Sequence, residues 1–308
     1  MTSLLVSQRN FDSHVMPSGH PERAERIRAI EDALAAPEFA GLMRREAPTA
    51  DLALAELVHA PGYLDALRRY RPAEGMAQID EDTFISAGSM DAAATALGGG
   101  LLALDAVALG EVANAFCASR PPGHHAEIER PMGFCLINTI SIVAREAQRK
   151  YGAERVAIVD FDVHHGNGTE DIFKADGSVF YGSTHQWPLY PGTGAASMVG
   201  VGNICNTPLD AGTGTDDMRA AYDERILPAL EAFRPDFLFI SAGFDADHRD
   251  PLGGLNWRSS DFGWVTRRLM EVADRVCGGR IVSMLEGGYD RAGLATGAAA
   301  HVTALMGR

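Results

Sequence analysis

The sequence predicts an α/β protein, a three-layer sandwich in which a mostly parallel sheet is flanked by helices on both faces. Short apolar runs of strand length alternate with longer amphipathic or alanine-rich stretches, as in successive βαβ units. Two runs, at 156–161 and 237–242, are almost continuously hydrophobic, which is typical of strands buried on both faces. No repeat, heptad array or low-complexity linker divides the chain, so we expect residues 1–308 to form one domain.

The expected elements follow from this pattern. Gly19-His20-Pro21-Glu22 predicts a helix start with proline in the first turn. Strands are expected at 112–118, 156–161, 179–182, 237–242 and 281–285, each followed by turn residues. Helices are expected at 90–108, 138–151, 216–233, 259–276 and 292–306.

Composition and charge argue against several classes of protein. The net charge of −14 disfavours non-specific nucleic-acid binding, and it is compatible both with a cationic substrate and with simple solubility. No run of about 18 apolar residues marks a membrane span, and the first residues lack the basic segment of a signal peptide. The four cysteines show no CxxC spacing, which predicts reduced thiols in a cytoplasmic protein: Cys117, Cys135, Cys205 and Cys277.

Four of the expected strands end in short loops that carry unusual polar residues. These loops span residues 120–125, 160–168, 241–247 and 285–290. In open parallel sheets, ligands bind in the crevice outside the carboxyl ends of the strands. The sequence therefore predicts that the four loops converge on one site.

One of these loops carries a pattern suited to a metal ion. If the backbone stays extended after the strand at 156–161, Asp160, Asp162 and His164 project from one face. Asp162 and His164 can then ligate one cation, with Asp245 from the strand at 237–242 as a third ligand. Three protein ligands with open coordination are typical of catalytic zinc. Because the set contains no cysteine, Fe²⁺ and Mn²⁺ are also compatible.

A histidine pair and a tyrosine lie on two other loops. His124 and His125 follow a rigid Pro-Pro-Gly segment, and such a pair can divide its roles between a neutral base and a charged partner. Tyr289 follows two glycines, where the backbone can approach a ligand closely. Its phenol can donate a hydrogen bond to a developing oxyanion.

Taken together, these segments resemble the histone deacetylase superfamily. The matching runs are GHPERAERI, RPPGHHA, MGFCLIN, VDFDVHHGNGTEDIF, YPGTG, SAGFDA, PLGG and EGGY, in order from about His20 to the C-terminal helix. The sequence is most similar to the class II branch and its bacterial deacetylase-like amidohydrolases. The resemblance implies an arginase–deacetylase fold with one catalytic Zn²⁺.

The resemblance also implies roles for individual residues. Asp162, His164 and Asp245 would hold the zinc ion, His125 would be the general base with His124 as its electrostatic partner, and Tyr289 would polarise the amide carbonyl. Asp160 falls on the carboxylate that orients His124. Asn167 stands behind His125, where class I members carry aspartate, and a neutral amide raises imidazole basicity less than a carboxylate does.

Two monovalent-cation sites, for K⁺ or Na⁺, and a substrate tunnel come with the resemblance. The first cation site would use Asp160, Asp162, His164, Ser183 and Thr184; the second would use backbone around Phe173, Asp176 and Val179. The acyl-lysine tunnel is expected at Gly133, Phe134, Tyr190 and Leu252, with Asp82 at the rim. His20 either lines the entrance or starts a helix.

The expected function is zinc-dependent removal of acetyl or other short acyl groups from acetyl-lysine-like amines, with oligomers possible and no direct nucleic-acid or membrane partner. An acetylpolyamine amidohydrolase shares these motifs, although the short stretch between Tyr70 and Ala92 favours an open cleft. A two-manganese, arginase-like site would need more bridging carboxylates. A non-catalytic acyl-lysine-binding protein would be expected to lack Tyr289 or the histidine pair.

Overall fold

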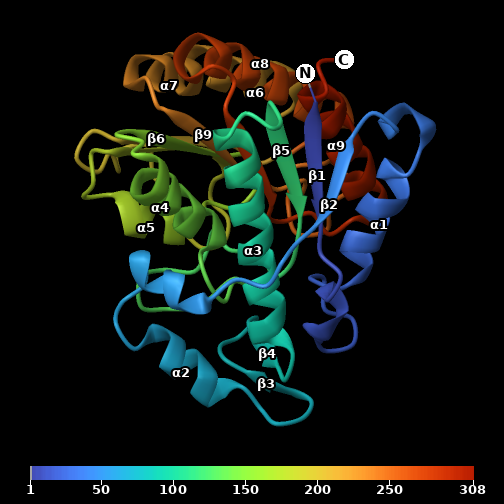
Figure 1. Ribbon diagram of the computed structural model, residues 1–308. Helices are drawn as coiled ribbons and strands as arrows, with labels where there is room; N and C mark the ends of the chain where they lie inside the picture. Colours follow the sequence, from blue (N-terminus) through green and yellow to red (C-terminus); the bar gives the residue numbers. More distant parts are fainter. Residues whose placement is uncertain (1) are drawn as a thin grey trace.

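A computed structural model describes residues 2–308, and its centre is an eight-stranded sheet in the order β2-β1-β5-β10-β9-β6-β7-β8 (Figure 1). The strands are β1 (Ser3–Ser7), β2 (Met43–Glu46), β5 (Asn114–Ala118), β6 (Val156–Asp160), β7 (Val179–Gln186), β8 (Ile204–Leu209), β9 (Phe237–Ala242) and β10 (Ile281–Leu285). Every neighbouring pair is parallel. All eight carboxyl ends therefore lie at one edge of the sheet.

Helices cover both faces of this sheet, which confirms the three-layer α/β prediction (Figure 1). One face is covered by α1 (Glu25–Leu34), α6 (Thr215–Ala221), α7 (Leu227–Phe233), α8 (Ser259–Cys277) and α9 (Arg291–Leu305). The other is covered by α3 (Ser89–Ala108), α4 (Thr139–Tyr151) and α5 (Asn167–Phe173). Beyond the carboxyl edge lie α2 (Tyr63–Tyr70) and the antiparallel pair β3 (Met76–Gln78) and β4 (Phe84–Ser86).

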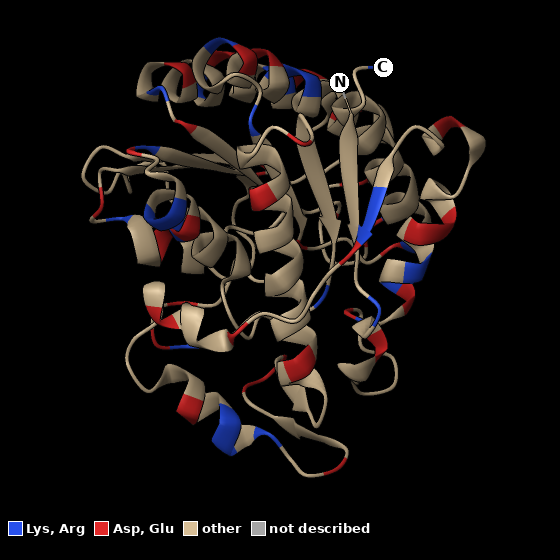
Figure 2. Ribbon diagram, in the orientation of Figure 1, with Lys and Arg blue, Asp and Glu red and all other residues tan. Residues whose placement is uncertain are grey.

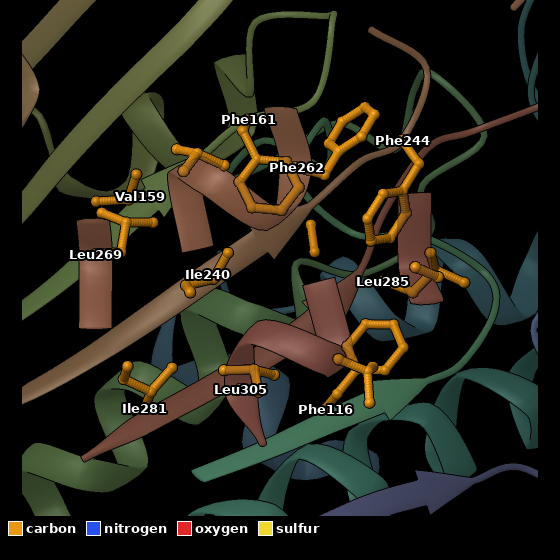
Figure 3. Packing of buried hydrophobic residues seen from close by; sticks show 14 of the residues in the cluster. Phe116, Val159, Phe161, Ile240, Phe244, Phe262, Leu269, Ile281, Leu285 and Leu305 are labelled. Carbon is orange, nitrogen blue, oxygen red and sulfur yellow. The ribbon is translucent and has the colours of Figure 1, made fainter. Parts of the chain in front are cut away.

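An aromatic cluster fixes the loops that leave this edge (Figure 3). Phe244 packs edge to face against Phe262 at 5.2 Å, Phe161 at 5.9 Å and Phe116 at 6.4 Å between ring centroids. All four rings are buried. Phe161 directly follows β6 and Phe244 lies just beyond β9, so each ring anchors the start of a loop that carries polar residues. Such pairs stabilise the fold by about 0.5–1.5 kcal/mol each beyond their burial.

The structure corrects the expected helix start at Pro21. Helix α1 begins at Glu25, and residues 20–23 are not helical. The reason is a buried ion pair: the Glu22 carboxylate accepts bonds from Arg120 Nε and Nη2 at 2.8 and 2.6 Å. Holding Glu22 against Arg120 keeps the preceding turn out of helical geometry, and it leaves His20 free to reach the cavity described below.

The helix expected at 216–233 is interrupted. Helices α6 and α7 are joined by a π-helical turn at Tyr222–Ile226. Pro228 at the start of α7 has no N–H, and its ring would clash with the carbonyl four residues earlier in a regular α-helix. The wider π turn relieves that clash.

Several elements gave no clear signal in the sequence. The interior strand β1, the edge strands β2 and β8, the hairpin β3–β4 and the short helices α2 and α5 were not expected. Strand β7 runs four residues beyond the expected end. Residues 183–186 are polar, yet they are fully or nearly buried, and Ser183 and Thr184 bond to the buried side chains of His185 and Tyr222. Hydrophobicity alone therefore underestimates β7.

Charged side chains lie mainly on the helices and loops, while the strands are almost free of them (Figure 2). The exception is the edge strand β2, whose Arg44, Arg45 and Glu46 alternate in exposure. Charge on an edge strand discourages pairing with another chain. Among the described residues, one helix, α3, is long and apolar enough to cross a membrane, but 78% of its most apolar window is buried in this domain. It packs against β5, β10 and α4 as a core helix.

Buried histidines predict a pH dependence of stability. Burial lowers the pKa of His301 from 6.5 to about 3, so below pH 6.5 the unfolded chain binds a proton that the folded chain does not. This contribution to the unfolding free energy is therefore lost as the pH falls, by about 1.4 kcal/mol per pH unit between 6 and 4. Urea titrations over this range give the slope of the unfolding free energy against pH. In His301→Gln this slope is expected to be smaller by the contribution of one proton. His248→Gln, at a half-exposed position, serves as the control; equal slopes in the two variants would refute this assignment.

Candidate active site

The four polar loops converge at the carboxyl edge of the sheet, as the strand pattern predicts. Asp162 and His164 follow β6, and Asp245 follows the neighbouring β9. One ligand atom from each of these three buried residues lies within 4.8 Å of the others. Among the described residues, this is the one group of three or more such side chains placed to hold a metal ion.

The local backbone differs from the extended segment that the alternation argument assumes. Strand β6 ends at Asp160, and the chain then turns. Asp162 N donates to Asp160 Oδ1 at 3.1 Å, and His164 N donates to Asp162 Oδ1 at 2.9 Å. Two successive aspartate turns therefore bring Asp162 and His164 together. Asp160 lies apart from them and accepts a bond from the His124 ring.

The donor set fits a divalent cation. Asp245 Oδ1 accepts a bond from Val163 N at 2.9 Å, but its buried Oδ2 has no hydrogen-bond partner. His164 Nδ1 lies 3.2 Å from that oxygen and 3.1 Å from Asp162 Oδ1. A buried carboxylate oxygen without a donor costs free energy unless a cation neutralises it. Two carboxylates and one imidazole suit Zn²⁺ or Fe²⁺.

The backbone at Gly287 lies so close to these carboxylates that no side chain fits there. Gly287 N donates to Asp162 Oδ2 at 2.7 Å. A Cβ atom added at Gly287 would lie 2.1 Å from Asp245 Oδ2 and 2.5 Å from Asp162 Oδ2. This close approach explains the glycine directly after Glu286.

The histidine pair is held by carboxylates behind it. Gly123 N and His124 N both donate to Glu286 Oε2, at 2.7 and 3.1 Å. His124 Nδ1 lies 3.0 Å from Asp160 Oδ2, and the two histidine ring centroids are 4.0 Å apart. Glu286 thus ties the loop after β5 to the loop after β10.

The two imidazoles have different charge states. Burial alone would lower the pKa of His124, but the carboxylates of Asp162 and Asp160 raise it to about 10. Burial, together with the charges of His124 and His164, lowers the pKa of His125 well below its usual value. These opposite shifts favour a charged His124 beside a neutral His125.

The tautomer of His125 follows from Asn167. Asn167 Nδ2 donates to Glu127 Oε1 at 2.7 Å, so its Oδ1 faces His125 Nδ1 at 2.8 Å as an acceptor. Because that oxygen requires a donor, the proton of the neutral ring is on Nδ1. Nε2 of His125 therefore carries the free lone pair.

Tyr289 lines the same cavity as His125. Its backbone N–H donates to Asp250 Oδ2 at 2.6 Å, and the Arg26 guanidinium lies 4.9 Å from its ring centroid. Arg26 also donates to the carbonyls of Gly288 and Glu286. Burial raises the pKa of Tyr289 well above its ordinary value, so the phenol keeps its proton and can act as a donor.

A cavity of about 410 Å³ joins these groups. It is lined by His125, His164 and Tyr289, by the expected tunnel and entrance residues Gly133, Phe134, Tyr190, Leu252, Asp82 and His20, and by Pro21, Glu81, Phe84 and Leu189, which sequence reasoning missed. His20 Nε2 lies 3.1 Å from the Asp82 carbonyl oxygen, so it fixes the entrance and does not start a helix.

Residues expected at the two monovalent sites lie around the ends of β6 and β7 and at the end of α5. Asp160 is buried and accepts bonds from Tyr181 and Asp162, and the Ser183 and Thr184 hydroxyls pair with His185 and Tyr222. The carbonyls of Phe173, Asp176 and Val179 all accept bonds from the Asn203 side chain. This side-chain contact was not expected.

Supporting residues were also missed by sequence reasoning. Arg26, Glu22 and Glu286 belong to matched runs, GHPERAERI and EGGY, but the runs assign them no role. Asp250 precedes PLGG and gives no signal of its own. Arg26, Glu22 and Glu286 could have been found because each is a charged residue without an assigned role inside a matched run.

Comparison with known proteins identifies the family of this chain. The profile of the family described as "Histone deacetylase domain" matches residues 20–305. This chain belongs to the histone deacetylase family. "Histone deacetylase 10, chloroplastic" of Oryza sativa subsp. japonica is 39% identical over 309 residues, covering 94% of this chain and 70% of its own length. "Histone deacetylase-like amidohydrolase" of Pseudomonas aeruginosa is 38% identical over 281 residues, covering 89% and 74%.

A solved member of the histone deacetylase family shares the fold. The structure described as "Crystal Structure of HDA15 HD domain" superimposes with a TM-score of 0.92 at 36% identity, covering 99% of this chain and 89% of that one. The expected arginase–deacetylase fold is thus confirmed. As a histone deacetylase family member, this chain is a hydrolase of the deacetylase and amidohydrolase type.

Proposed function

We propose that this protein is a zinc-dependent amidohydrolase that removes acetyl or other short acyl groups from acetyl-lysine-like amines. One observation carries the proposal: His164 of the metal-ligand cluster, the neutral His125 and Tyr289 line the same cavity. A non-catalytic acyl-lysine-binding protein has no need for this set. The two-manganese alternative is disfavoured because the described residues offer one three-residue cluster.

Asp162, His164 and Asp245 would hold the divalent ion. When bound, such an ion lowers the pKa of water and polarises a carbonyl as a Lewis acid. The protein contributes fixed ligand geometry: Gly287 N orients Asp162, and Val163 N orients Asp245. Backbone donors of this kind hold the carboxylates in place before substrate arrives.

His125 would take the proton of the attacking water. Its Nε2 lone pair is free because Nδ1 is committed to Asn167. The positive charge favoured on His124, which Asp160 holds, adds positive potential beside the reacting centre. The same charge lowers the pKa of His125 and so favours a neutral His125 before it takes the proton of the water. A histidine of the pair then protonates the leaving amine.

Tyr289 would donate a hydrogen bond to the oxygen of the reacting carbonyl. Arg26 lies against the ring, and Asp250 holds the tyrosine backbone, so the phenol is fixed before the reaction. Preorganised donors of this kind are typically worth about 3–4 kcal/mol of transition-state stabilisation.

The cavity walls suit a linear acyl-amine. Phe134 and Tyr289 meet edge to face at 5.7 Å, and Tyr190 and Leu252 add apolar surface. Glu81 and Asp82 lie at the entrance end, in the segment that follows β3. Two acidic residues there favour a cationic substrate, and this observation also supports the second candidate, an acetylpolyamine amidohydrolase.

A rate comparison separates the two candidates. The zinc-loaded protein is assayed on an acetyl-lysine peptide, acetylputrescine and acetylspermidine, with the metal-free protein as control. A kcat/KM on the peptide at least 10-fold above both polyamines supports the proposed function, and the reverse order supports the second candidate. No metal-dependent release of acetate from any of the three would refute both.

Two further proposals accompany this function. A K⁺ or Na⁺ ion beside Asp160, near Ser183 and Thr184, is supported by the complete burial of that carboxylate within a polar group of side chains. A cytoplasmic location is supported by the four cysteines, all of which are free thiols.

A further inference from the structure

Three backbone carbonyl groups between α5 and β7 converge on one side chain. The carbonyl oxygens of Phe173, Asp176 and Val179 lie 2.8, 3.0 and 2.7 Å from Asn203 Nδ2. Asn203 directly precedes β8, and only 2% of it is exposed. They belong to the backbone around Phe173, Asp176 and Val179 that the family resemblance assigns to a second monovalent cation.

The orientation of the Asn203 amide is fixed by its other contacts. Its Oδ1 accepts a bond from Val201 N at 3.2 Å, and its backbone carbonyl accepts from Tyr181 N at 3.0 Å. A flipped amide would place an oxygen against three carbonyl oxygens and leave the Val201 N–H facing an NH₂ group. The nitrogen therefore faces the carbonyl cradle.

The amide nitrogen of Asn203 can offset the repulsion between the carbonyl oxygens, as a cation would. Phe173 O and Asp176 O each accept one backbone bond, from Asp176 N and Val179 N at 2.9 and 3.1 Å. Three carbonyl oxygens that converge in a buried place still repel one another, and a donor or a positive charge between them relieves that repulsion. The two protons of Nδ2 serve three acceptors at hydrogen-bonding distance. A monovalent ion coordinated by all three oxygens would have to occupy the position of Nδ2.

The surrounding charges do not call for an ion either. The Asp176 carboxylate is already paired with Arg145 at 2.6 Å and accepts a hydrogen bond from Ser178 Oγ at 2.7 Å. The Arg145 guanidinium also lies 4.8 Å from the Phe173 ring centroid. Arg145 thus neutralises the one carboxylate of this turn, and Asn203 supplies hydrogen-bond donors to its carbonyls.

We infer that Asn203 replaces the second monovalent cation in this chain. The residues at that place do not fit an ion, and the turn between α5 and β7 is held by a covalently attached amide. The protein then binds one monovalent cation fewer than the family resemblance implies. This inference depends on the fold and not on the proposed catalytic activity.

Ion counting tests the inference directly. Crystals of the full chain are grown with Tl⁺ in place of K⁺, and anomalous scattering locates the ions. We expect no Tl⁺ among the carbonyls of residues 173, 176 and 179 in the wild type. In Asn203→Ala, which vacates the cradle, we expect one additional Tl⁺ at that place. A Tl⁺ peak there in the wild type, with Asn203 turned away, would overturn the inference.

Thermal unfolding provides a second measurement. Asn203→Ala is expected to unfold at a lower temperature in choline chloride and to recover by about 3 °C or more in KCl beyond any K⁺ effect on the wild type. Asn206→Ala is the matched control, because this buried asparagine on β8 donates to the Glu170 carboxylate and not to the cradle. The control is expected to lose stability without gaining K⁺ dependence.

An equal K⁺ effect on the wild type, Asn203→Ala and Asn206→Ala would contradict the inference. If Asn203→Ala does not fold, the wild-type ion positions still decide the question. Loss of deacetylase activity is not used as a readout, so failure of the proposed function would leave this test intact.

Discussion

Asp245→Ala is expected to yield a folded protein that has lost its divalent ion and, with it, essentially all turnover. The carboxylate supplies one of three ligands, and its Oδ2 makes no other bond in the structure. Even residues that only support metal ligands typically change metal affinity by 10- to 100-fold, so loss of a direct ligand is expected to cost more than 100-fold. Elemental analysis after dialysis measures the metal content, and acetate release measures turnover.

Asp247→Asn is the matched control for this prediction. Asp247 is a buried aspartate two residues farther along the same segment, but its carboxylate pairs with Arg249 at 2.7 Å and lies outside the cluster. This variant is expected to keep a full complement of metal. Full zinc content in Asp245→Ala would refute the ligand assignment, whatever the turnover of that variant.

The second large effect is expected for Tyr289→Phe. This change removes one hydroxyl group, and the ring, its contact with Phe134 and the backbone bond to Asp250 all remain possible. Because the hydroxyl is proposed to act on the reacting carbonyl, kcat is expected to fall by about 10²–10³-fold. Metal content and the unfolding temperature are expected to stay at wild-type values.

Tyr63→Phe separates this effect from the general loss of a buried phenol. The Tyr63 hydroxyl donates to the Leu136 carbonyl at 2.7 Å and does not line the cavity. Its loss is expected to cost about 1 kcal/mol of stability and to leave kcat within a few-fold. An unchanged kcat in Tyr289→Phe on an acetyl-lysine peptide would remove tyrosine from the mechanism.

The fold class and the meeting of four loops were predictable because both follow from local patterns. Buried parallel strands are continuously apolar, and parallel strands place their carboxyl ends at one edge. The five expected strands are all present, and every one of them lies inside the eight-stranded sheet. Edge strands such as β2, with its alternating arginines, carry too little hydrophobic signal to be found this way.

The details of the site could be predicted only in part. The sequence predicts that Asp162, His164 and Asp245 lie together, and they do. The extended backbone from which this was argued is wrong, because two aspartate turns shape that loop. The contact of Asn203 with three carbonyls joins residues 24 to 30 positions apart and has no periodic signal. The displaced start of α1 likewise depends on Arg120, 98 residues away from Glu22.

The hydrogen bonds from Arg26 to the Gly288 and Glu286 carbonyls have a consequence for biosynthesis. The two bonds join residues about 260 positions apart, and the tyrosine loop that they hold follows β10, the last strand of the sheet in chain order. A nascent chain on the ribosome has therefore made Arg26 and both histidines long before their partner loop exists. Hydrolytic competence is expected to arise only after the tyrosine loop has been synthesised and has met Arg26, so chains interrupted before residue 286 are expected to be inactive.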